Sequence, residues 1–360
     1  MVIYLKSKFY FLQLFYTRIY LEPKLRAELD IRLDHQASLF QNLNGEVDNV
    51  EVRFAEGNPY LHNLVFDTMP MILHGNGPSK MFLNTVANYI PANWHAEEGC
   101  LDCWRDNLDF KSLVETPRVL LAVFIEAPTP FMDEFWEKLT GLRYDKSAID
   151  LLVHNSVDHH EKQVQEFVAY WTSENLVDKF NSVQRIAAGV SETDARNQAL
   201  AACTTLKCDY LFVVDSVAHL DNPNTLALLI EQNRDVVAPL LIRPYSAWSN
   251  FWGSLSRDGF YARSLDYMDI VRNDRRGLWN VPFISACYLV QGSLLYEDNL
   301  GLTYTSGEGL DRDMALAASV RDLGLFMYVS NRVNFGHLVN NDKFPTAHLN
   351  NELWEMERNR

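Results

Sequence analysis

The chain has 360 residues, of which 48% are apolar and 22% charged, as in an ordinary globular protein. Acidic residues outnumber basic ones by 47 to 32, and the net charge of −15 disfavours nucleic acid and anionic membranes as main partners. No stretch approaches the ~20 apolar residues that span a bilayer. The length predicts two domains, because a single core seldom grows beyond about 250 residues.

The amino-terminal hundred residues predict short strands separated by turns. Lys6 and Lys8 precede a mostly apolar run, 9–16, that loosely imitates a secretory signal. No small-residue cleavage site follows, so we interpret this run as a truncated or misassembled start. Asn44-Gly45 is typical of a hairpin turn. The expected strands are 31–33, 37–40, 50–54 and 61–66, and a helix is expected over 80–88.

A glycine-rich run, His74-Gly75-Asn76-Gly77-Pro78-Ser79-Lys80, follows a strand-like apolar segment. A neutral imidazole is a good ligand for a divalent metal. Glycines at 75 and 77 let the backbone approach a ligand closely, and a lysine holds phosphate as a point charge. The run therefore indicates a metal-bound diphosphate site, with a plain turn as the alternative.

From residue 118 onward, strands and helices alternate. Segment 119–125 is a continuous apolar run typical of a buried parallel strand. Thr129-Pro130 predicts the start of a helix that ends at Gly141, and Ser191 predicts the cap of another that reaches residue 203. Further strands are expected at 149–153, 210–214 and 236–240, and further helices at 162–170 and 222–232. This alternation predicts a doubly wound α/β layer with its ligand site beyond the strands' carboxyl ends, where Asp215 lies.

Five cysteines fall into two close pairs and a single residue, Cys287. Cys100 and Cys103 form a CxxC motif, which fits a redox pair or half of a zinc site. Cys203 and Cys208 have a looser spacing, and no histidine accompanies either pair.

A His-x-Asp motif, His219-Leu220-Asp221, matches half of a non-haem iron triad, with His337 or His348 as a third ligand. That triad belongs on the strands of a β-barrel, whereas this segment joins a parallel strand to a helix. We therefore expect no iron site here.

Blocks of sequence along nearly the whole chain resemble the procollagen lysyl hydroxylase family. In chain order they begin with Leu14-Phe15-Tyr16-Thr17-Arg18-Ile19-Tyr20-Leu21 and Phe40-Gln41-Asn42-Leu43-Asn44-Gly45. They continue with the 74–80 run, Gly99-Cys100-Leu101-Asp102-Cys103, Trp248-Ser249-Asn250-Phe251-Trp252-Gly253 and Leu349-Asn350-Asn351-Glu352-Leu353-Trp354-Glu355. The resemblance implies that residues 12–112 are the carboxyl-terminal part of a glycosyltransferase domain with its connector. Residues 113–355 would be an accessory domain with a type-A, Rossmann-like glycosyltransferase fold.

The resemblance also implies a site, cofactors and partners. His74 would bind Mn(II), and Gly75, Asn76, Gly77 and Lys80 would line the diphosphate of a UDP-sugar. The partner Asp-x-Asp would lie before residue 12, and the dioxygenase domain with Fe(II), 2-oxoglutarate and ascorbate would lie after the last residue, so the chain is expected to be a fragment. Collagen or procollagen would be the partner, with a possible homodimer. The compartment would be the endoplasmic reticulum lumen, with a disulfide in each close cysteine pair and Cys287 as a buried thiol.

Three features of the second domain have competing interpretations. In type-A transferases two carboxylates after the fourth strand hold the donor's cation, but here that motif is Asp215-Ser216-Val217, which favours a vestigial pocket. Asp311 and Asp313 fit an acceptor-facing acidic pair, but we favour a helix cap with a first-turn acid. The aromatic block at 248–252 fits equally a sugar or collagen-binding surface and a buried core.

Two hypotheses follow, and a third is weaker. The first is an enzyme part: a collagen-modifying lysyl hydroxylase and glycosyltransferase with a remnant UDP-sugar and manganese site. The second, favoured for the chain alone, is a non-catalytic accessory module that orients neighbouring domains or binds collagen. The third is an independent nucleotide-sugar transferase that uses Asp215 and Asp311.

Overall fold

A computed structural model describes residues 9–91, 94–101, 103–173, 176–256, 260–296, 301–306, 309–342, 344 and 346. The chain forms two compact units, the first from residues 1–51 and 61–74 and the second from residues 52–60 and 75–360. Among the described residues no helix is both long and apolar enough to cross a membrane.

The first unit contains two helices and a short parallel strand pair. Helices α1 (Phe9–Leu21) and α2 (Pro23–Glu28) precede strand β1 (Phe40–Asn42), which pairs in parallel with β4 (Ile72–His74). The strand predicted at 31–33 is absent, since these described residues have no regular structure. Asn44-Gly45 lies in a turn that joins no hairpin. The hairpin is formed instead by β2 (Val50–Ala55) and β3 (Asn58–Asn63), and its residues 52–60 belong to the second unit. Its connecting residues Glu56 and Gly57 both have positive φ angles.

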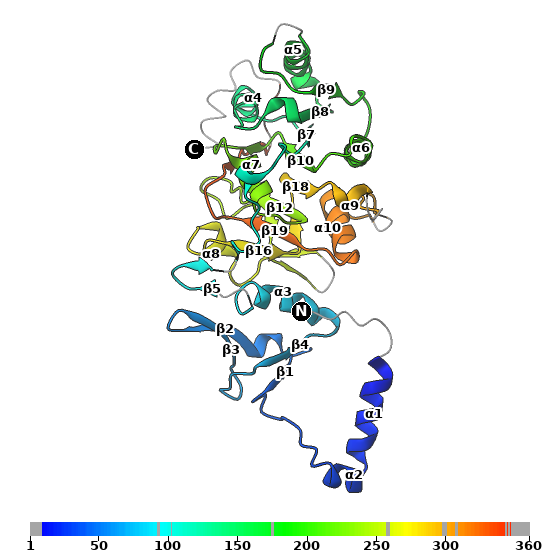
Figure 1. The fold of residues 1–360 in the computed structure, drawn as a ribbon, viewed down its shortest axis with the longest axis vertical. Helices are drawn as coiled ribbons and strands as arrows, with labels where there is room; N and C mark the ends of the chain where they lie inside the picture. Colours follow the sequence, from blue (N-terminus) through cyan, green and yellow to red (C-terminus); the bar gives the residue numbers. More distant parts are fainter. Residues whose placement is uncertain are drawn as a thin grey trace. The chain divides into compact units, whose positions relative to one another are not determined.

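The second unit is built on an eight-stranded mixed sheet in the order β16-β19-β12-β18-β10-β7-β8-β9 (Figure 1). Strands β7, β8 and β10 run parallel, as expected, together with β9, which was not predicted. In contrast, β18 lies antiparallel between β10 and β12, and β16 is antiparallel to β19. The strand bounds are β7 (Val119–Ile125), β8 (Ile149–Asn155), β9 (Ser182–Arg185), β10 (Tyr210–Asp215), β12 (Val236–Pro239), β16 (Leu278–Val281), β18 (Cys287–Gln291) and β19 (Met327–Ser330).

Helices cover both faces of this sheet, because its central strands are apolar on both sides. One face packs against α6 (Glu192–Leu206), α8 (Tyr267–Val271) and α10 (Arg312–Asp322). The other packs against α4 (Met132–Thr140), α5 (Glu161–Trp171) and α7 (Thr225–Glu231). Helix α9 (Ser293–Tyr296) contacts β18 and α6. The doubly wound layer predicted from the alternating pattern is therefore present.

Smaller elements complete the second unit. Helix α3 (Lys80–Ala87) follows the glycine-rich run. The short strand pairs are β5 (Trp94–His95) with β6 (Gly99–Cys100), β11 (Ala218–His219) with β20 (His337–Leu338), β13 (Phe251–Trp252) with β17 (Phe283–Ile284), and β14 (Ser254–Leu255) with β15 (Tyr261–Ala262). Trp94 is buried and packs its ring against Phe54, Tyr89 and Trp279.

The cysteines have the expected arrangement. Cys100 is bonded to Cys103 and Cys203 to Cys208, while Cys287 is a buried free thiol on β18. The disulfides that the family resemblance implied are therefore confirmed, and neither pair is a zinc ligand set.

Candidate functional site

The glycine-rich run divides between the two units. His74 ends β4 in the first unit, with an exposed side chain and a backbone carbonyl that accepts a hydrogen bond from Leu43 N at 2.9 Å. Gly75 to Lys80 belong to the second unit. In the described part of the chain, His74 is not a member of any group of three or more potential metal ligands.

Within the second unit, the run forms a tight turn into α3. The backbone N–H of Asn76 donates to Ser79 Oγ at 3.1 Å, and this hydroxyl donates back to the Asn76 carbonyl at 2.8 Å. Gly77 has a φ of 54°, and a Cβ on Gly75 would lie only 2.8 Å from Leu83 Cδ1. The glycines are thus needed by the turn itself. Asn76 and Lys80 are exposed, so their polar groups remain open to a ligand.

A buried ion pair occupies the end of β10, where a type-A transferase would hold its cation. Asp215 is the last residue of this strand, and its Oδ1 lies 2.6 Å from Nη2 of Arg196 on α6. The Arg196 side chain is fully buried and also lies over the Phe124 ring, with Cζ 4.3 Å from the centroid. Burial alone lowers the pKa of Arg196, but the Asp215 charge outweighs it and holds the pKa well above its usual value. Arg196 therefore stays cationic beside Asp215.

Further charges surround this pair. Arg196 Nε donates to Glu192 at 2.9 Å, and Arg312 on α10 forms an ion pair with the same carboxylate. Burial raises the pKa of Glu192 to about 7, although Arg196 and Arg312 oppose this rise. Burial also raises the pKa of Asp313, to about 6. We call these five residues, Glu192, Arg196, Asp215, Arg312 and Asp313, the charge cluster.

The two carboxylates at the start of α10 have different roles. Asp311 is the N-cap, and its Oδ1 accepts a hydrogen bond from Met314 N at 2.9 Å, as the capping interpretation predicted. It also accepts hydrogen bonds from the Tyr261 hydroxyl at 3.0 and 2.8 Å. Asp313 is the first-turn acid that the same interpretation predicted. It also interacts electrostatically with Arg196 and Asp215, which the sequence interpretation did not anticipate.

The loop after β10 is also inaccessible to a ligand at Ser216. This residue precedes Val217, which occupies the position of the missing second carboxylate. Ser216 is 3% exposed, and its hydroxyl shares a 2.8 Å hydrogen bond with that of Thr129. Thr129 was predicted to cap α4, but the helix begins later, at Met132. The Thr129 hydroxyl is used for this tertiary contact and for the Ala127 carbonyl instead.

The aromatic block combines the two predicted environments. Phe251 is fully buried, and Asn250 is buried with its side chain bonded to backbone groups of Pro239 and Leu241. Trp248 is 45% exposed, and Trp252 stacks on Tyr267. The inner residues Asn250 and Phe251 are therefore core, whereas Trp248 and the half-buried Trp252 offer partly open aromatic faces.

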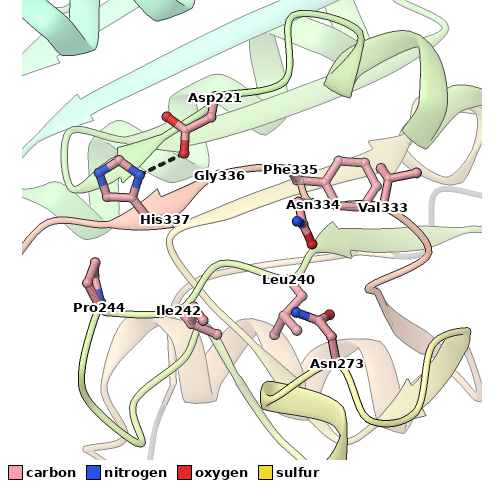
Figure 2. A pocket seen from close by; sticks show the side chains of 10 residues that line it. All are labelled: Asp221, Leu240, Ile242, Pro244, Asn273, Val333, Asn334, Phe335, Gly336 and His337. Atoms are coloured by element: carbon pink, nitrogen blue, oxygen red, sulfur yellow. Dashed lines mark hydrogen bonds and ion pairs between the residues drawn. The ribbon is translucent and has the colours of Figure 1, made fainter.

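The His-x-Asp motif lies in a setting that the sequence interpretation did not anticipate. His219 is in strand β11, directly opposite His337 of β20 in the antiparallel register. His337 Nδ1 is 2.8 Å from Asp221 Oδ2, as Figure 2 shows. Burial lowers the pKa of His219 to about 4, with added effects from the Lys138 and His337 charges. His219, Asp221 and His337 thus come together, although not on a β-barrel. His348 lies outside the described residues.

The sequence signal for the charge cluster was present but weak. Glu192 and Arg196 are four residues apart on a helix, which by itself is typical of a solvated surface pair. However, Arg196 shares its helical face with Ala195, Ala199 and Cys203, all of which are buried. A charge inside an apolar stripe indicates a buried partner, but the partner itself follows only from the fold.

Sequence comparisons show that the chain is similar along nearly its whole length to procollagen-lysine 5-dioxygenases. Residues 12–100 match the family described as PLOD GT domain, and residues 190–356 match the Glycosyltransferase family 25, N-terminal domain. The chain is 43% identical over 350 residues to procollagen-lysine,2-oxoglutarate 5-dioxygenase 2 of Mus musculus, with 96% of this chain and 47% of the relative covered. It is 44% identical over 352 residues to procollagen-lysine,2-oxoglutarate 5-dioxygenase 1 of Bos taurus, with coverage of 96% and 48%. The chain spans about half the length of these curated relatives.

Two solved structures resemble the fold more distantly. One is the mannosyltransferase PcManGT from Pyrobaculum calidifontis in complex with GDP-Man and Mn2+, with a TM-score of 0.43, 16% identity and coverage of 64% of this chain and 59% of that one. The other is GalNAc-T7 with UDP, GalNAc and Mn2+, with a TM-score of 0.41, 13% identity and coverage of 62% and 44%.

These findings confirm two expectations from the sequence. The resemblance to the procollagen lysyl hydroxylase family holds over 96% of the chain. The mixed sheet with helices on both faces, together with the family 25 match, agrees with the expected α/β, glycosyltransferase-like fold class.

Proposed function

We propose that this chain, whose relatives over 96% of its length are procollagen-lysine 5-dioxygenases, takes part in the modification of procollagen lysines. In this proposal residues 113–355, which make up most of the second unit, are a non-catalytic accessory module with a glycosyltransferase-like fold. Its task is to orient neighbouring catalytic domains or to hold the collagen chain.

The Arg196–Asp215 ion pair is the observation on which this proposal rests. A donor site needs carboxylates that are free to coordinate a divalent cation. Here the one carboxylate left at that position already has a buried guanidinium 2.6 Å away. A cation placed beside Arg196 would be repelled, and displacing Arg196 would leave its own charge buried without a partner. The arginine thus substitutes permanently for the metal.

The run from His74 to Lys80 is proposed to serve the donor site of the amino-terminal transferase region. His74 would supply an imidazole to Mn(II), and Gly75, Asn76, Gly77 and Lys80 would line the diphosphate of a UDP-sugar. The exposure of Asn76 and Lys80 supports this proposal, as does the tight turn that fixes them. The sugar would be transferred to hydroxylysine or to galactosyl-hydroxylysine, and the manganese would stabilise the departing UDP.

The proposed compartment is the lumen of the endoplasmic reticulum. Two short-range disulfides support it, because such bonds persist in oxidising compartments. Homodimerisation stays a prediction.

The test is nucleotide binding by the chain and its variants. We expect UDP with Mn(II) to raise the melting temperature, and His74→Ala and Lys80→Ala to reduce this effect. Lys207→Ala, which changes an exposed lysine of the second unit, is the matched control. Asp215→Asn should leave the nucleotide effect unchanged.

Two results would contradict the proposal in different ways. Loss of nucleotide binding in a folded Asp215→Asn variant would show that a donor binds at the end of β10, which favours the independent transferase. Unchanged binding in both His74→Ala and Lys80→Ala would remove the donor role of the run. The accessory role is tested by two further measurements, collagen-peptide binding and the activity that remains after deletion of residues 113–355. It would be refuted by no measurable peptide binding together with no loss of activity in the deletion variant.

A further inference from the structure

We propose that Glu134, His219 and His337 form a binding site for a divalent transition-metal ion of the Zn(II) type. One potential ligand atom from each residue lies within 4.8 Å of the other two. Across the described segments of the chain, this is the only group of three or more histidine, cysteine or acidic ligands so closely spaced. All three residues belong to the second unit, and none of them is a member of the charge cluster.

The fold brings these residues together from three distant segments. Glu134 lies in the first turn of α4, His219 in β11 and His337 in β20. The strands pair so that His219 faces His337, with ring centroids 5.4 Å apart. Gly336 permits this close approach, because a Cβ there would lie 1.9 Å from the His219 carbonyl oxygen.

His219 is the residue that most clearly indicates a ligand. Its side chain is fully buried, yet neither ring nitrogen has a hydrogen-bond partner within the described chain. The nearest carboxylate oxygen, on Glu134, is 3.8 Å from Nδ1, too far for a hydrogen bond. A buried imidazole without partners is unfavourable, and a metal ion bound to it would satisfy one nitrogen.

The neighbouring groups resemble the outer shell of a metal site. Asp221 accepts a hydrogen bond from His337 Nδ1 at 2.8 Å, which leaves Nε2 of that ring available as the ligand atom. Carboxylates commonly orient metal-binding histidines in this way. The ammonium of Lys138 contacts Glu134 and lies 2.5 Å from Asp221. Lys138 therefore competes with a metal ion for Glu134.

The ligand set identifies the class of metal. Two imidazoles and one carboxylate suit Zn(II), and three protein ligands leave a fourth position open. His337, Asp221 and Gly336 line a cavity of about 410 Å³. Figure 2 shows the His337 and Asp221 side chains close together at one side of this cavity. Water or a small oxygen donor in this cavity can reach His337, one of the three proposed ligands. The Glu134 and His337 side chains are 44% and 29% exposed, so the ion has a path of entry.

A surface ion-pair network is the competing explanation. It accounts for Glu134, Lys138, Asp221 and His337, because each of them has a charged partner. It does not account for His219, which no partner satisfies. The two explanations differ in whether the chain binds zinc and in whether removal of Lys138 strengthens that binding.

The experiment is a zinc titration of the whole chain after treatment with a chelator. Bound zinc is measured by equilibrium dialysis with elemental analysis. We expect one zinc ion per chain, and we expect His219→Gln and His337→Ala to weaken binding by about tenfold or more, since even outer-shell changes cost that much. His159→Ala removes an exposed histidine of the same unit and should change nothing. His337→Ala carries the test if His219→Gln does not fold, as checked by circular dichroism.

Lys138→Met gives the decisive comparison. Removal of the competing ammonium should tighten zinc binding about two- to fivefold, the equivalent of one exposed ion pair. Weaker binding in Lys138→Met would contradict the proposal. Three other results would also overturn it. The first is no bound zinc above the buffer control, and the second is equal zinc binding by His337→Ala and the unsubstituted chain. The third is an equal loss of zinc affinity in His159→Ala and His337→Ala.

Discussion

Removal of the Arg196 side chain tests the central electrostatic claim about the second unit. Arg196→Met keeps the length and apolar stem of the side chain but removes its charge. Asp215, 2.6 Å from Nη2, and Glu192, 2.9 Å from Nε, then lose their main partner in a buried setting. Breaking a buried ion pair from one side typically costs about 3–5 kcal/mol. Such a loss is a large part of the 5–15 kcal/mol typical of a folded domain.

Urea unfolding followed by tryptophan fluorescence measures this loss in the correct unit. All eight tryptophans have residue numbers of 94 or higher and so belong to the second unit. We expect the midpoint to fall sharply in Arg196→Met and to recover largely in Arg196→Met/Asp215→Asn, which removes the stranded charge. Lys162→Met breaks an exposed pair with Glu166 and should cost under about 1 kcal/mol. A loss below about 1 kcal/mol in Arg196→Met, or a double variant as unstable as the sum of its parts, would refute the reasoning.

Three further predictions concern stability. The folded-state pKa of Glu192 is about 7, above its ordinary 4.5, so the protonated carboxyl stabilises the fold at low pH. From pH 4.5 to 7 the free energy of unfolding of the unsubstituted chain should fall by about 2–3 kcal/mol relative to that of Glu192→Gln. Parallel pH curves of the two proteins in urea unfolding would contradict this. Gly336→Ala should lower stability by about 1–3 kcal/mol because its Cβ would overlap the His219 carbonyl, whereas Gly324→Ala, with open space and only a positive φ, should cost about 1 kcal/mol in the same assay. Loss of the Cys203–Cys208 bond in the double alanine variant should cost about 2 kcal/mol for its short loop, and an unchanged melting temperature under reducing conditions would contradict this.

Local sequence predicted the central elements well because their environment is uniform. Residues 119–125 form a strand with the predicted bounds, since an apolar run buried on both faces has few alternatives. Ser191 caps α6 as expected, and its hydroxyl accepts a hydrogen bond from Asp194 N. Where a residue has a tertiary partner, local rules fail. Thr129 does not cap α4, because its hydroxyl contacts Ser216, which is 87 residues away in sequence.

The candidate sites were less predictable, for the same physical reason. Asp215 could be placed at a strand end from the pattern alone, and the missing second carboxylate was visible beside it. The identity of its partner, Arg196, depends on how α6 packs against the sheet. His219 and His337 are paired through strands far apart in the chain, so their proximity cannot be inferred from periodicity. The sequence interpretation discounted an iron site here because the segment joins a parallel strand to a helix and does not belong to a β-barrel.

The free thiol of Cys287 has a consequence for how the chain matures. Its sulfur is fully enclosed on β18, and burial, with the nearby Asp215 charge, raises the pKa of the thiol well above its usual value. Thiol–disulfide exchange requires an accessible thiolate, so the native fold protects its odd cysteine from attacking the Cys203–Cys208 bridge. Cys287 can therefore form a wrong disulfide only before the sheet has formed. Pairing of β18 with β10 buries the Cys287 thiol and so prevents this exchange.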